Sequence, residues 1–223
     1  MFLAEKILLF FRRMGIRAKL PQGVEVLNPY QNTATFSICG QFYRKYYNDN
    51  RERALIMGIN PGRLGGGLTG IPFTDPIKLQ DVCNIPNSLK KKAELSADFI
   101  YSVISGFGGP EKFFSRFYFS SVSPLGFTMN GKNLNYYDIP KLQSALKPFI
   151  VDCLKEQSGF GLKTSTCFVL GEGKNYAYLK SLNEEFRFFK TLMPLPHPRF
   201  VMQYKRKKLK EYVQRYCETL NIA

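Results

Sequence analysis

The chain has few of the residues from which metal centres and disulfide frameworks are built. Only one of its 223 residues is a histidine, His197, which excludes every multi-histidine metal site and the H-E-x-x-H motif. None of its cysteines forms a C-x-x-C pair, so neither a zinc site nor a disulfide framework is expected. These scattered cysteines, which fit a reducing, intracellular setting, are Cys39, Cys83, Cys153, Cys167 and Cys217.

Long hydrophobic runs are also missing. The apolar segment 2–13 is interrupted by Glu5 and Lys6, and its basic residues follow the apolar stretch, so it predicts an amphipathic helix and neither a signal sequence nor a membrane span. Acidic residues are scarce, at 17 against 32 Lys and Arg, which leaves a net charge of +15. That excess favours a polyanionic partner such as DNA, although a merely basic soluble protein has the same composition.

Short apolar runs alternate with helical patterns along the chain. The 44% hydrophobic content is enough for a core. Strands are predicted at 53–59, 117–123, 165–170 and 188–193, with a short one near 35–38 and a loop at 126–133. Helices are predicted at 3–14, from Asp75-Pro76 onward, at 96–105, from Asp138-Ile139-Pro140 to about 156, after Asn175 to 182 and at 202–220.

This alternation predicts an α/β fold with a parallel sheet covered on both faces. No internal repeat or linker is visible. We therefore expect one domain over residues 1–223, on which residues 1–50 pack as a helical and irregular extension, and a monomer.

The stretch from residue 54 to residue 73 organises the chain. A buried strand ends in the turn Gly58-Ile59-Asn60-Pro61-Gly62, which projects one amide side chain from the carboxyl end of that strand, where α/β proteins bind ligands. Three glycines follow at 65–67, and Gly70-Ile71-Pro72-Phe73 then presents a fixed aromatic ring. An amide, a small-residue loop and a fixed ring together predict a pocket for a flat ligand.

Two glycine-lysine segments raise the possibility of phosphate binding. Gly126 to Lys132 has P-loop spacing, but Asn133 stands where Mg²⁺ binding needs Ser or Thr, so a nucleotide triphosphate site is rejected. The loop could still hold a nucleic-acid phosphate through backbone N–H groups. Residues 171–175 lack the third glycine of a dinucleotide fingerprint, which favours a structural role, with a phosphate contact by Lys174 as the alternative.

His197 is boxed between Pro196 and Pro198 after a predicted strand. Such a rigid mount suits a directed hydrogen bond, although a lone histidine is often structural, and both interpretations stay open from this segment alone. Five of the six residues from Lys205 to Lys210 are basic, which on a helix beside the histidine loop favours a phosphate-facing surface over a merely solvated one.

In combination these motifs resemble the single-strand-selective monofunctional uracil-DNA glycosylase family, in the uracil-DNA glycosylase superfamily, and a divergent bacterial branch of it. Residues 58–62 and 69–75 match its G-M-N-P-G…T-G-V-P-F-G-E motif without a gap. Residues 123–125 and 131–134 are similar to its C-P-L and G-K-N-L motifs, and 197–199 looks like a shortened H-P-S-P-R. The resemblance covers about residues 50–220.

The resemblance implies a three-layer α/β/α fold with a four-stranded, mostly parallel sheet, and hydrolysis of the N-glycosidic bond of uracil in DNA without metal or cofactor. By position, Asn60 orients the attacking water and His197 donates a hydrogen bond to base O2. Phe73 stacks on the flipped base, and Ile59 lines the pocket with its backbone. The other positions carried over or inferred are Gly58, Gly62 and Ser121 in the pocket and Lys132, Asn133, Lys174, Arg199, Phe200, Lys205 and Arg206 on DNA.

Two departures from the family pattern affect specificity. Ser121 aligns with the base-reading asparagine, within one residue either way, and its single hydroxyl predicts weaker discrimination, so xanthine or hypoxanthine could be accepted. The shortened loop after His197 brings Phe200, Met202 and Tyr204 forward as candidates for a wedge that fills the gap left by the flipped nucleotide. The alternative function is a catalytically weak or inactive DNA-binding protein on the same fold.

Overall fold

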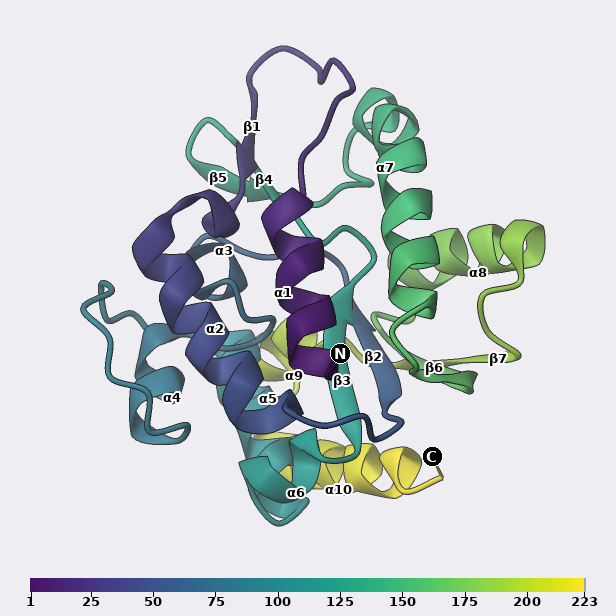
Figure 1. The fold of residues 1–223 in the computed structure, drawn as a ribbon. Coiled ribbons are helices and arrows are strands. Elements are labelled where there is room, and N and C mark those ends of the chain that lie inside the picture. The colour runs from purple at the N-terminus through teal and green to yellow at the C-terminus, as the bar shows by residue number, and fades with distance from the viewer. Residues whose placement is uncertain (223) are drawn as a thin grey trace.

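The computed structural model describes residues 1–222 and is built on a four-stranded parallel sheet in the order β3-β2-β6-β7 (Figure 1). The strands are β2 (Ala54–Gly58), β3 (Phe117–Ser121), β6 (Lys163–Leu170) and β7 (Thr191–Leu195). All three pairings in this sheet are parallel, so the four predicted strands are confirmed and the sheet is wholly parallel. Helices cover both faces, which gives the predicted α/β/α layers.

Strand β3 shows how the layers are held together. Side chains alternate between the two faces of a strand. Accordingly, Tyr118 meets Tyr47 of one helical layer, while Phe117 and Phe119 meet Phe113 of the other. Strand β3 therefore has buried aromatic packing on both of its faces, which explains why its first three residues are all aromatic.

The helices are placed mainly by capping and by apolar spacing. Asp75 accepts hydrogen bonds from the N–H groups of Ile77 and Lys78, which confirms the predicted helix start there. The α-helices are α1 (Leu3–Arg13), α2 (Thr33–Tyr47), α3 (Gly66–Thr69), α4 (Pro76–Asp81), α5 (Leu95–Gly106), α6 (Pro110–Phe114), α7 (Pro140–Ser158), α8 (Lys174–Phe186), α9 (Pro198–Tyr204) and α10 (Leu209–Leu220), with 3-10 turns η1 at Pro29–Gln31 and η2 at Arg206–Lys208.

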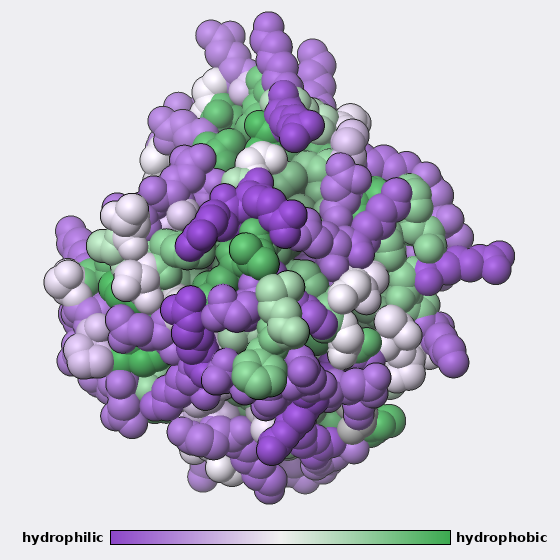
Figure 2. Space-filling view, viewed as in Figure 1, coloured by the Kyte–Doolittle hydropathy of each residue, from purple (hydrophilic) through white to green (hydrophobic). Residues whose placement is uncertain are grey.

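The N-terminal segment packs on the core through α1 and α2. The strand expected at 35–38 is wrong, because that stretch is the start of α2. Asn32 caps this helix by accepting from the Thr35 N–H, and Cys39, Tyr43 and Tyr47 follow at helical spacing on its buried face. Figure 2 shows that hydrophilic side chains dominate the face of the molecule that carries α1 and α2. No helix within residues 1–222 is long and apolar enough to cross a membrane.

A second, antiparallel sheet replaces the loop that was expected at 126–133. Its strands are β1 (Val24–Leu27), β4 (Gly126–Met129) and β5 (Lys132–Leu134), in the order β1-β4-β5. Asn130 and Gly131 both have positive φ, as a tight hairpin turn requires. The glycine-lysine spacing therefore encodes a β-hairpin and not the loop between strand and helix of a P-loop.

The C-terminal basic segment is also organised differently from the expected single helix at 202–220. Helix α9 ends at Tyr204, the basic run forms η2, and α10 follows. Both helices pack against α5, and the Tyr216 hydroxyl donates to the Pro196 carbonyl, which ties α10 to the loop before His197. The helix expected from Asp138-Ile139-Pro140 begins at Pro140 as α7, with Ile139 at the N-cap, and the Asp138 carboxylate accepts from the Asn135 N–H instead of capping it.

Candidate active site

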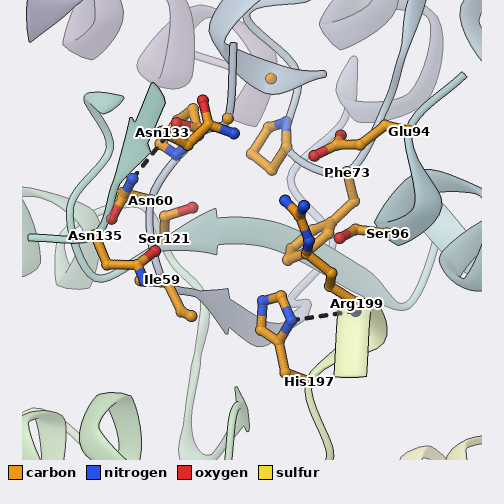
Figure 3. Close-up of a pocket in the computed structure, with 14 residues that line it drawn as sticks. Ile59, Asn60, Phe73, Glu94, Ser96, Ser121, Asn133, Asn135, His197 and Arg199 are labelled. Carbon is orange, nitrogen blue, oxygen red and sulfur yellow. Dashed lines mark hydrogen bonds between the residues drawn. The ribbon is translucent and has the colours of Figure 1, made fainter. Parts of the chain in front are cut away.

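A cavity of about 100 Å³ lies beyond the carboxyl ends of β2 and β3 (Figure 3). It is bounded by the turn after β2, the Phe73 segment, the residues before α5, the segment after β5 and the loop after β7. The sequence predicted six of its residues as pocket or catalytic positions: Ile59, Asn60, Gly62, Phe73, Ser121 and His197. Gly58 lies behind them and shapes the wall.

The amide of Asn60 is fixed by the chain that follows the hairpin. Its Nδ2 donates to the Leu134 carbonyl at 3.2 Å, and its Oδ1 accepts from the Tyr136 N–H at 3.0 Å. Nδ2 also donates a longer bond of 3.5 Å to the Pro61 carbonyl, so both donor hydrogens are used, and one acceptor lone pair of Oδ1 is left over. Asn60 is therefore held in one orientation at the cavity and can still bind a water molecule.

Phe73 supplies the flat wall of the cavity, and Gly58 makes room for it. The Phe73 backbone has a positive φ of 55°, a conformation that non-glycine residues seldom adopt outside constrained sites. A methyl group at residue 58 would lie 2.6 Å from the Phe73 ring, so only glycine allows the ring to lie against the end of β2. The glycine at the end of β2 thus allows the Phe73 ring to form the wall of the cavity.

Ser121 is the last residue of β3, and its side chain faces the cavity (Figure 3). Neither Ser120 nor Val122 lines the cavity, so Ser121 is the one of these three residues that a ligand there would meet. The Ser121 hydroxyl has no hydrogen-bond partner within residues 1–222. It is consequently free to bond a ligand that enters.

His197 is the N-cap residue of α9, and this position determines its tautomer. Pro198 has no N–H, and the Arg199 N–H donates to His197 Nδ1 at 3.2 Å. Burial, and secondarily the charge of Arg199, lowers the pKa of His197 to about 4, so the ring is neutral at neutral pH. With Nδ1 as acceptor, the proton is on Nε2, which faces the cavity (Figure 3).

A wider groove of about 820 Å³ adjoins the cavity and shares His197, Asn133 and Arg199 with it. Its lining holds four cationic side chains, and its one acidic residue, Glu172, pairs with Arg215 at 3.3 Å. The groove brings together five of the predicted DNA contacts: Lys132, Asn133, Lys174, Arg199 and Phe200. Lys205 and Arg206 are exposed but lie outside the lining.

The three wedge candidates after His197 differ in how far their side chains are exposed to solvent. Phe200 is 43% exposed and Tyr204 is 71% exposed, and both line the groove. Met202 is only 7% exposed because it lies on the face of α9 that packs inward. Met202 was therefore a wrong candidate, whereas the other two are positioned to meet a ligand.

The segment 171–175 has the structural role that the sequence favoured. Asn175 is buried, donates to the carbonyls of Gly58 and Leu170, and accepts from the Tyr136 hydroxyl. It thereby links the ends of β2 and β6 to the segment that holds Asn60. Lys174 points outward, lies 5.9 Å from the Tyr137 ring centre and lines the groove.

Sequence reasoning missed several lining residues. Asn135 could have been found, because it lies two residues beyond Asn133 in an extended segment and so projects to the same side. Arg63, which lines the groove, directly follows the turn at residues 58–62. Glu94 and Ser96 had no such signal, because only the fold brings the start of α5 to the cavity. No cluster of three or more His, Cys, Asp or Glu suited to a metal occurs among residues 1–222.

The parallel sheet, the amide and histidine at its carboxyl edge, and the basic groove fit a hydrolase that acts on a base in DNA. The uracil DNA glycosylase superfamily model matches residues 44–221, so the chain belongs to that superfamily and is a DNA glycosylase of base excision repair. It is also similar to the crystal structure of wild-type SMUG2 from Pedobacter heparinus, with 45% identity and a TM-score of 0.97. That match covers 100% of this chain and 98% of the other, and it confirms the predicted family resemblance.

Proposed function

We propose that the enzyme flips uracil out of DNA into the cavity and hydrolyses its N-glycosidic bond, and that it also accepts deaminated purines such as xanthine and hypoxanthine. The observation that carries this proposal is the neutral His197, whose Nε2–H faces the cavity. Uracil departs as a resonance-stabilised anion, so the site needs a fixed donor at the developing oxyanion more than it needs a strong acid.

The flipped base stacks on Phe73, and the backbone at Ile59 and the Ser121 hydroxyl border its other edges. His197 donates to O2 as negative charge grows there. A neutral imidazole suits this role, because it stabilises the anion without transferring a full proton. Serine offers one hydroxyl where an asparagine offers both a donor and an acceptor, which supports a broader choice of bases.

Asn60 binds and orients the water that attacks C1′. It is no base at neutral pH, and the sugar becomes cation-like as the bond breaks, so orientation is sufficient. A carboxylate would add base assistance, and the amide therefore predicts a slow enzyme. The bonds from Asn60 to Leu134 and Tyr136 support this role because they hold its side chain at one orientation.

The groove holds the DNA strand on either side of the flipped nucleotide. Its four cations face phosphates, and the exposed rings of Phe200 and Tyr204 are 5.6 Å apart, centre to centre. One or both rings fill the gap in the base stack. Lys205 and Arg206 add charge outside the groove.

A cleavage assay tests the proposal. Labelled strands, single and paired, carry one uracil, and the products are treated with alkali after incubation without metal and with a chelator. Wild type should give alkali-dependent breaks at uracil, and Asn60→Ala and His197→Ala should each lose about 100- to 1000-fold in rate while remaining folded. Binding to uracil-DNA without any break would instead support the alternative, a binding protein on this fold.

A further inference from the structure

Glu94 is a carboxyl group at the cavity to which neither the sequence nor the family motifs gave a role. It lies just before α5, and its backbone N–H donates to Asp75 Oδ2 at 2.9 Å. Asp75 is fully buried, so the backbone at Glu94 is held firmly in place. The Glu94 side chain does not cap its own helix and instead points toward the cavity, across from His197 (Figure 3).

The carboxyl group has no hydrogen-bond or ion-pair partner within residues 1–222. Its oxygens lie over the glycine loop: a methyl group at Gly62 would be 3.3 Å from Oε1, and one at Gly65 would be 1.8 Å from Oε2. The glycine at residue 65 is thus needed for Glu94 to occupy its position. A polar group held firmly at a cavity and left without a partner is available to a ligand.

We propose that Glu94 is the general acid for deaminated purines, donating its proton to N7 of the flipped base as the glycosidic bond breaks. This inference rests on the proposed glycosylase function and names the residue that extends it beyond uracil. Uracil has no ring nitrogen equivalent to N7, so its excision does not use this acid.

The surroundings of Glu94 keep a proton on it near neutral pH. Burial, and then the charge of Asp75, raises the pKa of Glu94 to about 7, with Asp98 on α5 acting in the same direction and Arg199 on α9 opposing them. General acids work best when their pKa lies near the working pH. His197, whose pKa is far lower, cannot take this role and acts only as a hydrogen-bond donor.

The step balances without any further reactant. The Glu94 O–H bond breaks and its proton joins N7, while the C1′–N9 bond breaks with its electron pair going to the purine. The water held by Asn60 forms the new C1′–O bond and loses a proton to solvent, and solvent later reprotonates Glu94. The net change is addition of water across the C1′–N9 bond.

The test compares single-turnover excision of hypoxanthine and of uracil from the same strand. Glu94→Gln keeps the shape but lacks the acidic proton, and it should lower hypoxanthine excision about 100-fold or more while leaving uracil excision within about threefold. Glu111→Gln, an exposed glutamate on α6, serves as the matched control and should change neither rate. Thermal unfolding checks that each variant is folded.

The pH profile gives a second readout that a merely structural role would not move. Wild-type hypoxanthine excision should fall as pH rises through about 7, because the acid form of Glu94 is lost. The Glu94→Gln profile should lack that fall. Glu94→Asp, which keeps an acid on a shorter stem, should recover part of the rate at low pH.

The outcomes separate this inference from the function on which it rests. Equal loss on both bases, no loss on either, or a wild type that excises uracil but no hypoxanthine would overturn the role of Glu94 and leave uracil excision standing. A wild type that removes neither base would overturn both. A wild type that removes only hypoxanthine, in a Glu94-dependent way, would support the acid and contradict the uracil proposal.

Discussion

Buried polar groups have all their hydrogen-bond partners at one end of β2 and lack some of them at the other end. At the amino end, Arg53 is completely buried and uses all five of its N–H donors, on Asp49 and on the carbonyls of Tyr46, Arg51 and Phe114. At the carboxyl end, the hydroxyl of Ser121 and the carboxyl of Glu94 lack protein partners, and Nε2 of His197 faces the cavity.

Burying a polar group without a partner costs about 1–3 kcal/mol, and more when the group is charged. The Arg53 end avoids that cost and stabilises the fold. At the cavity end, polar groups without partners carry part of this cost, which is expected where a ligand completes their hydrogen bonds. Changes at Arg53 should therefore alter the free energy of unfolding, whereas changes at the cavity should alter activity.

The largest expected effect is on stability at the Arg53 end. Arg53→Ala removes five hydrogen bonds and leaves the buried carbonyls of Tyr46 and Phe114 without this donor, so we expect a loss of about 3–5 kcal/mol in the free energy of unfolding, measured with urea. Arg51→Ala is the matched control, because the Arg51 side chain is exposed and meets the same Asp49 only at 3.8 Å, while the backbone N–H of residue 51 still donates to that carboxylate in the variant. It should change stability by less than about 0.5 kcal/mol.

The same pair predicts a dependence on pH. The hydrogen bonds from Arg53 are the first cause of a lowered pKa at Asp49. The stability from this carboxylate is therefore present above about pH 4 and is lost as pH falls through its folded pKa. The gap in stability between wild type and Arg53→Ala should narrow in that acidic range, and a gap that stays constant would contradict the assignment.

Ser121→Asn tests whether the residue at the end of β3 selects the base that is excised. An amide at the end of β3 can both donate to and accept from a pyrimidine edge, so we expect the ratio of uracil to xanthine excision to rise about tenfold, in line with one added hydrogen bond. Rates on the two bases from otherwise identical strands measure it. An unchanged ratio would show that Ser121 does not read the base.

Phe200→Ala probes the groove. Loss of one stacking ring should weaken binding to single-stranded DNA about fivefold to tenfold, with little change in stability because the ring is exposed. Met202→Ala, on the inward face of the same helix, should instead destabilise the fold by about 2–5 kcal/mol. If excision from single and double strands is unaffected by Phe200→Ala, the wedge role of Phe200 is wrong.

The smallest effect is expected at Lys205 and Arg206, which lie outside the groove lining. Removing either charge should weaken DNA binding only a few-fold and reduce the salt dependence of the binding constant by about one phosphate contact. Lys90→Ala, on an exposed loop, is the control. A salt dependence that matches the control would remove these two residues from the DNA surface.

Features that are set by short sequence patterns could be predicted, whereas residues that only the packing of distant segments brings together were missed. The strand at residues 54–58, the Asp75 cap and the turn with Asn60 follow from short patterns, and the family motifs added Ser121 and His197. The hairpin at Asn130-Gly131 was missed although its turn signal was present, because the same segment also has the glycine-lysine spacing of a P-loop. Glu94 could not be found, since only the packing of α5 brings it to the cavity.

The most direct test of the account is the NMR titration of His197, which is unambiguous because the chain has a single histidine. We predict a neutral ring with its proton on Nε2 from about pH 5 to about pH 8, protonating only near pH 4, as burial and the Arg199 N–H bond require. A ring that titrates near about 6.5, the ordinary histidine value, or that carries its proton on Nδ1, would contradict the proposed oxyanion donor.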